Sequence, residues 1–217
     1  MIKEQYVVGI DEAGRGPLAG PVAVGVTVVP GNFDWKEILP GVNDSKQLSE
    51  KKREEIFKVA RRLKAAGRLD YAVVMVSAKV IDKTGIVPAV NLAMSRALKK
   101  ISTRTTLSYH TINRMIRTSP KNYVVKLDGG LKAPAEFKNQ ETIIKGDSKE
   151  KIIGLASIMA KVTRDRYMVQ KASTKLFAPY DFATHKGYGT QKHRTAIAKF
   201  GLTVEHRKSY CKNIILL

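Results

Sequence analysis

The hydrophobic and polar positions of this chain follow two different periodicities, and the first of them predicts strands. Between Val22 and Val28, valine occupies every second position, which is the spacing of a strand with one buried face. Four further short apolar segments are bounded by turn residues. Strands are therefore expected at Gln5–Asp11, Pro21–Val29, Asp70–Val76, Tyr123–Asp128 and Thr142–Asp147.

The second periodicity, with apolar residues three and four positions apart, predicts helices. The first of these helices has Ser49 in the N-cap position and Gly67 as a stop signal. Pro179 interrupts the pattern late in the chain, and a loop rich in glycine and histidine follows it. Helices are expected at Glu50–Ala66, Ala89–Ile101, Lys149–Lys171 and Thr190–Phe200.

The order of these elements bears on the fold class. Strands come first and are then mixed with helices, which favours an α/β or α+β sheet packed by helices. A chain of 217 residues can bury one large core without disulfides or structural metal. The residues from about Phe177 onward change character and are expected to form a satellite of the main domain.

Charge narrows the class of partner. The chain has 39 Lys and Arg residues against 19 Asp and Glu residues, and its formal net charge is +20. The excess is spread along the sequence and exceeds what solubility alone requires. A folded basic surface that binds a polyanion, above all nucleic acid, is therefore expected.

Cysteine content and hydropathy exclude other classes. The single cysteine, Cys211, rules out an intramolecular disulfide and a cysteine-rich zinc site. The first apolar run, Tyr6–Ile10, is too short for a signal peptide, and no run reaches the length of a membrane span. A cytoplasmic protein in a reducing compartment, with no membrane contact, is expected.

The candidate chemistry lies where the acidic residues fall. Asp11, Asp128 and Asp147 each end a predicted strand, and Glu12 adds a fourth carboxylate beside the first. Carboxylates that converge at one sheet edge resist ionisation unless a cation lies among them. Oxygen ligands without cysteine or paired histidines suit Mg²⁺ or Mn²⁺, and in a protein that binds phosphodiesters they suggest a two-metal site.

Each acid also has a structural alternative at this stage. Asp147 and Glu150 have the spacing of a capping box for the helix that follows them. Asp128 precedes two glycines, as at the end of many strands, and Asp11 with Glu12 fits the start of a turn. Taken singly these alternatives are the commoner ones, and the convergence of three strand ends is what favours a metal site.

Two loops are candidates for substrate contact. Gly14-Arg15-Gly16 lacks the spacing of a phosphate-binding loop of nucleotide-binding proteins. It is either a hairpin turn or a place where backbone amides approach a ligand, with Arg15 available to a phosphate. Tyr188, between two glycines, either stacks on a base or sugar or packs within its loop. The four histidines are too scattered along the sequence to form a ligand set, and serine or cysteine hydrolase chemistry is unsupported.

These segments together resemble the type 2 ribonucleases H, the ribonuclease HII family. The resemblance runs in order through most of the chain. An N-terminal domain like that of the related type 3 enzymes is not expected, since Asp11 lies close to the start. The matching motifs are Gly9–Val22, Asn43–Leu48, Leu127–Gly129, Lys145–Ser148, Ala156–Asp165 and His185–Thr190.

The resemblance implies a fold and an activity. The fold is a ribonuclease H-like mixed central sheet flanked by helices over residues 1–176. Residues 177–217 form a small helical C-terminal extension of the same domain that binds substrate. The activity is a divalent-metal endonuclease that cuts the RNA strand of RNA–DNA hybrids and nicks duplex DNA 5′ to single ribonucleotides, leaving 3′-hydroxyl and 5′-phosphate ends.

The resemblance also assigns residues to roles. Asp11, Glu12, Asp128 and Asp147 would be catalytic and hold two Mg²⁺ or Mn²⁺ ions. The backbone of Gly14, Arg15 and Gly16 would read the ribose 2′-hydroxyl, Tyr188 would stack at the RNA-to-DNA junction, and Lys46 and Arg15 would contact phosphates. A monomer is expected, and no replisome partner is indicated. The rival hypothesis is a non-catalytic basic protein that binds nucleic acid, and the four intact carboxylates argue against it.

Overall fold

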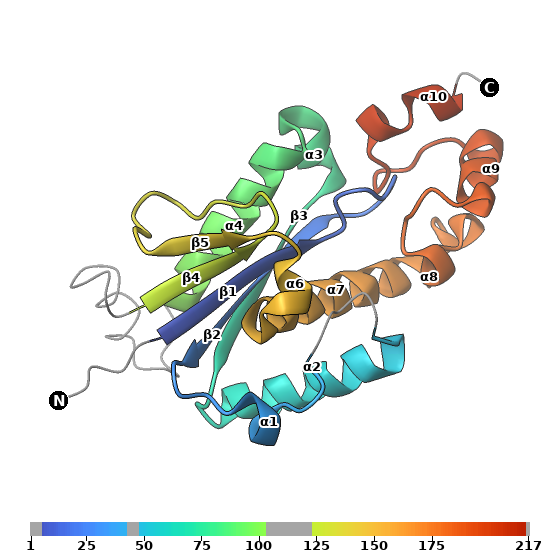
Figure 1. Cartoon of the computed structure of the whole chain (residues 1–217). Coiled ribbons are helices and arrows are strands. Elements are labelled where there is room, and N and C mark those ends of the chain that lie inside the picture. Colours follow the sequence, from blue (N-terminus) through green and yellow to red (C-terminus); the bar gives the residue numbers. More distant parts are fainter. Residues whose placement is uncertain (1–5, 43–47, 103–122, 216–217) are drawn as a thin grey trace.

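A five-stranded mixed sheet forms the centre of the molecule (Figure 1). The structure is a computed structural model and describes residues 6–42, 48–102 and 123–215. The strand order is β3-β2-β1-β4-β5, in which β1, β2 and β3 pair antiparallel while β4 and β5 continue parallel to β1. The strands are β1 (Tyr6–Ala13), β2 (Val22–Pro30), β3 (Asp70–Val76), β4 (Tyr123–Asp128) and β5 (Gln140–Ile143).

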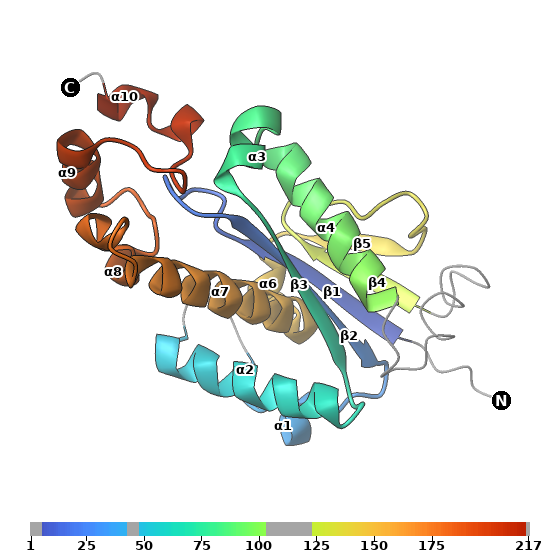
Figure 2. The same cartoon turned by 180° about the vertical axis from the view of Figure 1, so that it is seen from behind.

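Helices cover both faces of this sheet, as Figures 1 and 2 show from opposite sides. On one face α4 packs against β2 and β3, and its apolar residues join those of the sheet in one core cluster. On the other face α7 lies across β1 and β2, with α2 beside it in a second cluster. The helices of these layers are α1 (Trp35–Ile38), α2 (Glu50–Ala65), α3 (Ala78–Thr84), α4 (Ile86–Ser102), α6 (Gly146–Lys149) and α7 (Lys151–Ala172).

Two glycines allow α7 to lie directly on the sheet. A Cβ atom at Gly9 would come within 2.3 Å of the Ile152 carbonyl oxygen, and one at Gly25 within 2.2 Å of the Ala156 carbonyl oxygen. Such distances are impossible for a side-chain carbon, so only glycine permits this approach. The placement of α7 relative to the end of β1 therefore depends on these two residues.

The last part of the chain packs beyond the C-terminal end of α7, where Figure 1 shows it in orange and red. Its third hydrophobic cluster includes Phe177, Phe182 and Ile197 and also takes in Leu18 from the connection between β1 and β2. The segment is thus built onto that connection. Its helices are η2 (Ala178–Tyr180), α8 (Phe182–His185), α9 (Gln191–Phe200), η3 (Lys208–Tyr210) and α10 (Lys212–Ile215).

Most expected elements are confirmed. The strands at Asp70–Val76 and Tyr123–Asp128 have the expected bounds, and Ser49 caps α2 by accepting a hydrogen bond from the Lys52 amide. In the part of the chain that the structure describes, no helix combines the length and apolar character needed to cross a membrane.

One predicted strand is wrong in its second half. Thr142–Asp147 was expected to be extended, but β5 ends at Ile143 and α6 begins at Gly146. Lys145 between them has a left-handed conformation, with φ of 56°. The side chain of Ile144 is 74% exposed, so the apolar run that suggested a strand does not continue into the core. The short helices α1, α3 and α8 were not predicted.

Candidate active site

Two neighbouring parallel strands bring the first pair of carboxylates together. Ile10 of β1 is in register with Leu127 of β4, so Asp11 and Asp128 follow at the same edge of the sheet. Residues in register on neighbouring parallel strands lie side by side, so Asp11 of β1 is next to Asp128, the last residue of β4, although β1 itself continues to Ala13. The expected convergence of these two acids is present in the structure.

Asp11 is one of two nearly fully buried carboxylates in the group. Its side chain is 4% exposed, and its Oδ1 accepts a hydrogen bond of 2.7 Å from the Glu12 amide. Burial raises the pKa of Asp11 well above its usual value, the negative charges of Glu12 and Asp128 raise it further, and a hydrogen bond from the Ser157 side chain opposes them. The carboxyl group lies where a positive charge would stabilise its ionised form.

Asp147 reaches the same place from α6. Asp128 Oδ1 accepts hydrogen bonds from the Gly146 amide at 2.6 Å and the Asp147 amide at 3.4 Å, which ties the start of α6 to the end of β4. Asp147 is 3% exposed. A Cβ atom at Gly146 would lie 2.6 Å from Ile153 Cδ1, so a larger residue there would require the Ile153 side chain to move.

The capping alternative for Asp147 is wrong. The residue lies inside α6, and the N-cap of α7 is Glu150, which makes no side-chain capping bond. Glu150 instead forms an ion pair of 2.8 Å with Lys126. Burial of Asp147 beside Asp128 therefore does not follow from the start of a helix.

The partners of the two Glu12 carboxylate oxygens indicate whether a cation fits this site. Its Oε1 forms an ion pair of 2.9 Å with Arg15, while its Oε2 is buried and accepts no hydrogen bond from the described residues. A buried carboxylate oxygen without a donor is costly unless a cation replaces the donor. The all-oxygen donor set suits Mg²⁺ or Mn²⁺. Over the described ranges no three acidic, histidine or cysteine side chains form a ready-made metal cage.

The glycine-rich connection between β1 and β2 is held by two fully buried arginines. The Arg207 guanidinium donates to the carbonyls of Gly14 at 2.6 Å, Arg15 at 2.8 Å and Gly20 at 3.0 Å. That of Arg164 donates to the carbonyls of Pro21, Ala19 and Lys186 at 2.9–3.0 Å. The connection joins antiparallel strands, as the hairpin interpretation expected, but the arginines determine its shape.

Burial has a clear electrostatic effect on both arginines. Burial lowers the pKa of Arg207 to about 10, and the positive charge of Arg164 contributes to the shift. Burial also lowers the pKa of Arg164. Three backbone carbonyls replace the water that each guanidinium loses, which is how a buried charge is tolerated without a full ion pair. Neither arginine was recognised from the sequence, because a buried cation has the same local pattern as a surface one.

The Tyr188 ring is partly exposed and lies beside α7. Its side chain is 42% exposed, and two cations flank the ring: Lys161 Nζ at 5.5 Å and Arg164 Cζ at 5.8 Å from the ring centre. Loop packing would have buried the ring, so this alternative is not supported. An exposed aromatic face beside cations suits stacking on a nucleic acid.

Three of the four histidines lie close together in the structure. His185, His193 and His206 are all buried and lie in one group behind Tyr188, although they are 21 residues apart in sequence from first to last. These three histidines, far apart in sequence, are thus neighbours in space, although in the described part of the chain no three acidic, histidine or cysteine side chains are arranged to hold a metal ion. Lys46 lies outside the described residues, as does His110.

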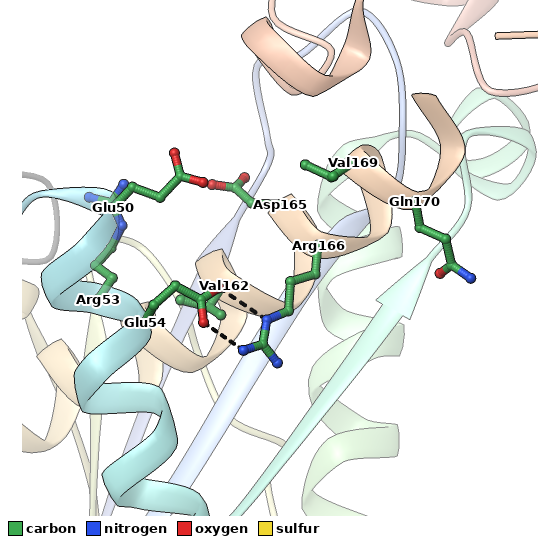
Figure 3. A pocket seen from close by; sticks show the side chains of 8 residues that line it. All are labelled: Glu50, Arg53, Glu54, Val162, Asp165, Arg166, Val169 and Gln170. Atoms are coloured by element: carbon green, nitrogen blue, oxygen red, sulfur yellow. Dashed lines mark hydrogen bonds and ion pairs between the residues drawn. The ribbon is translucent and has the colours of Figure 1, made fainter. Parts of the chain in front are cut away.

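A pocket between α2 and α7 offers a contrast with the carboxylate group (Figure 3). Its acids already have cations: Glu54 is held by Arg166 through two hydrogen bonds, and Asp165 pairs with Lys161 at 3.0 Å. Paired charges of this kind have little to offer a metal ion. The carboxylates at the ends of β1 and β4 are the stronger candidate for chemistry.

Comparisons with known proteins identify one family over most of the chain. The family described as Ribonuclease HII matches residues 8–213. Ribonuclease HII of Endomicrobium trichonymphae is 44% identical over 94% of this chain and 84% of its own, and that of Clostridioides difficile is 41% identical over 97% and 71%. The crystal structure of ribonuclease H2 from Pyrococcus horikoshii superposes with a TM-score of 0.64 at 28% identity, covering 97% of both chains.

Proposed function

The chain belongs to the ribonuclease HII family, and we propose that it nicks duplex DNA on the 5′ side of single embedded ribonucleotides. Members of this family are type 2 ribonucleases H, endonucleases that act on RNA–DNA hybrids. The observation that carries the finer proposal is a group of buried carboxylates beside a braced glycine loop, within a chain of net charge +20. The products carry 3′-hydroxyl and 5′-phosphate ends.

The family depends on divalent metal ions, and Asp11, Glu12, Asp128 and Asp147 are the residues that would hold Mg²⁺ or Mn²⁺ here. Two ions held there would supply activation of water and stabilisation of the leaving oxygen of a phosphodiester. The chain itself contributes rigidity, since each of these carboxylates belongs to β1, β4 or α6, and water is largely excluded from Asp11 and Asp147.

The glycine loop supplies hydrogen-bond donors for the 2′-hydroxyl. The carbonyls of Gly14 and Arg15 point at Arg207. In a trans peptide the following amide points the opposite way, so the amides of Arg15 and Gly16 point away from Arg207. A Cβ atom at Gly16 would meet nothing within 4 Å, which leaves room for a ribose. The 2′-hydroxyl is the group that separates RNA from DNA.

The remaining contacts complete the proposal. Tyr188 stacks on the deoxyribose that follows the ribonucleotide, and Lys46 and Arg15 contact phosphates. Residues 177–217 form the substrate-binding extension of the catalytic domain 1–176. The enzyme acts as a cytoplasmic monomer in ribonucleotide removal and hybrid clearance.

The deciding experiment uses a DNA duplex that contains one ribonucleotide. The purified chain is incubated with this duplex and either Mg²⁺ or Mn²⁺, and the cleaved strand is mapped at single-nucleotide resolution. We expect one nick on the 5′ side of the ribonucleotide and a 3′-hydroxyl that a polymerase extends. A long RNA–DNA hybrid, run in parallel, reports the general activity of the family.

The rival function, binding without catalysis, predicts a different result. A binding protein would shift both duplexes in a gel but leave them uncut with either metal. A chain that cuts the hybrid but not the single-ribonucleotide duplex would overturn the finer proposal and leave the family activity intact. An all-DNA duplex serves as the matched control and should remain uncut.

A further inference from the structure

Three histidines form a buried group directly behind Tyr188. His185 and His193 are stacked with ring centres 4.4 Å apart, and His206 lies 5.2 Å from His193. Their side chains are 8%, 0% and 2% exposed, respectively. They come from the end of α8, from α9 and from the segment before η3, so they join three parts of the C-terminal extension.

The hydrogen bonds determine which nitrogen of His206 carries the proton. The Thr203 backbone amide donates to His206 Nδ1 at 2.9 Å, and a backbone N–H can only donate. His206 Nδ1 is therefore an acceptor, and the proton of the neutral ring is on Nε2. That nitrogen lies 3.0 Å from Nε2 of His193, to which it donates.

The hydrogen bonds also determine which nitrogen of His193 carries the proton. Because its Nε2 accepts from His206, its own proton is on Nδ1, which donates to the Tyr188 carbonyl at 2.9 Å. Both rings are used as a donor and an acceptor, and each therefore has to be neutral. Burial favours this state by lowering the pKa of His193 and His206 to about 4.

We propose that His193 and His206 are positioning residues that hold Tyr188 in register with the glycine loop. The proposal rests on the proposed role of Tyr188 at the junction. The His193 side chain holds the Tyr188 carbonyl on one side. On the other side the amides of Leu18 and Ala19 donate to the Gly187 carbonyl at 2.9 and 3.2 Å.

This arrangement links the two parts of the site that recognise substrate. Leu18 and Ala19 belong to the same connection as Gly14–Gly16, so the backbone next to Tyr188 is bonded directly to it. A Cβ atom at Gly187 would come within 2.4 Å of the Ala19 carbonyl oxygen, which shows how close the two segments lie. Backbone contacts therefore fix the distance between the Gly14–Gly16 backbone, which would contact the 2′-hydroxyl, and Tyr188, which would contact the junction. The histidines keep the backbone at Tyr188 from moving.

Two substitutions at His193 separate positioning from packing. In asparagine the amide nitrogen lies near the place of Nδ1, so His193→Asn can still donate to the Tyr188 carbonyl. In His193→Gln the longer side chain reaches toward His206 instead, so the side-chain donor to the Tyr188 carbonyl is lost and the Thr190 amide, at 2.9 Å, still donates to it. Packing alone predicts the opposite ranking, because asparagine fills less of the buried space than glutamine.

The measured quantity is the ratio of kcat/KM for a single-ribonucleotide duplex to kcat/KM for a long hybrid. We expect His193→Gln to lower this ratio about tenfold, the size of one lost stacking contact, and His193→Asn to stay within about twofold of the original chain. Equal losses in both variants, or a larger loss in His193→Asn, would overturn the proposal.

A spectroscopic measurement on the unaltered protein needs neither folding of a variant nor activity. Nitrogen-15 NMR distinguishes the two neutral tautomers of histidine. We expect the proton on Nδ1 of His193 and on Nε2 of His206 at pH 7, and the reverse assignment at His193, or a charged ring at either, would overturn the proposal. If the unaltered chain fails to nick single ribonucleotides, the proposed function falls, whereas the tautomers still decide whether the histidines hold Tyr188.

Discussion

Two neighbouring regions of this molecule bury charged or polar groups in opposite ways. At the ends of β1 and β4, carboxylates are buried beside one another, and Glu12 Oε2 has no hydrogen-bond donor among the described residues. Around the glycine loop, Arg164 and Arg207 are buried just as deeply, yet each donates to three backbone carbonyls. The histidines behind Tyr188 are likewise satisfied by one another and by the backbone.

The difference shows what each region is built for. A group of buried like charges stores electrostatic repulsion that a bound cation relieves, so the carboxylates favour a ligand. A set of polar groups that satisfy one another gains nothing from a ligand and instead resists movement. The first region suits binding of a metal ion, and the second suits holding the glycine loop in one shape.

The largest effect is expected from Asp128→Asn. Asparagine keeps an oxygen for the amides of Gly146 and Asp147 but removes one negative charge from the group. We expect cleavage to fall by about a thousandfold or more, which is about 4 kcal/mol of transition-state stabilisation, while binding of an uncut hybrid is equal or tighter. Single-turnover cleavage and a filter-binding assay measure the two quantities. Loss of binding in proportion to activity would make Asp128 a structural residue.

The two regions should also respond oppositely to acid. The folded pKa of His193 and His206 is lowered from 6.5 to about 4, so the unfolded chain takes up protons first as pH falls. The contribution of these two histidines to the free energy of unfolding should be complete above pH 6.5. As pH falls toward 4 it should be lost, by about 3 kcal/mol per histidine. The pKa of Asp11 is raised in the fold, so its contribution has the opposite sign and is lost as pH rises through the folded pKa.

Urea unfolding between pH 7 and pH 4.5, in the presence of a metal chelator, separates these contributions. His206→Gln cannot titrate in this range and should flatten the loss of stability at low pH. Asp11→Asn should steepen it, because the compensating uptake of a proton by Asp11 disappears. If the free energy of unfolding depends on pH in the same way in both variants, the contrast between the two regions is contradicted.

A smaller effect is expected from Arg207→Met. The variant leaves the carbonyls of Gly14, Arg15 and Gly20 without their donor, and we expect the free energy of unfolding to fall by about 3 kcal/mol. Its exposed neighbour offers a matched control, since Lys208→Met removes a cation of similar size without touching the loop. Chemical denaturation measures both. An equal change in the two variants would show that net charge and not the loop contacts is responsible.

The smallest effect concerns Tyr188→Ala. Loss of one stacking ring should lower cleavage of a single-ribonucleotide duplex by about tenfold and cleavage of a long hybrid by less, because only the former depends on the junction. Initial rates on the two substrates provide the comparison. The junction role fails if both rates decrease equally.

Much of the fold follows from local patterns in the sequence. Alternating valines in β2, the apolar runs of β3 and β4 and the Ser49 cap of α2 each carry their signal within a few residues. The stretch around Asp147 does not, because its apolar residues resemble a strand while the left-handed Lys145 and the amide contacts to Asp128 turn the chain into α6. A long-range hydrogen bond outweighs a weak local preference there.

The sequence by itself determined the kinds of groups present: a basic chain, acids at the ends of predicted strands, a glycine-rich connection and an aromatic residue between two glycines. Only the tertiary structure decided which groups meet. It placed Arg164 and Arg207 beneath the glycine loop and joined three distant histidines behind Tyr188. The physical reason is that periodicity and capping act over a few residues, whereas burial and hydrogen bonding of polar side chains depend on contacts between segments far apart in the chain.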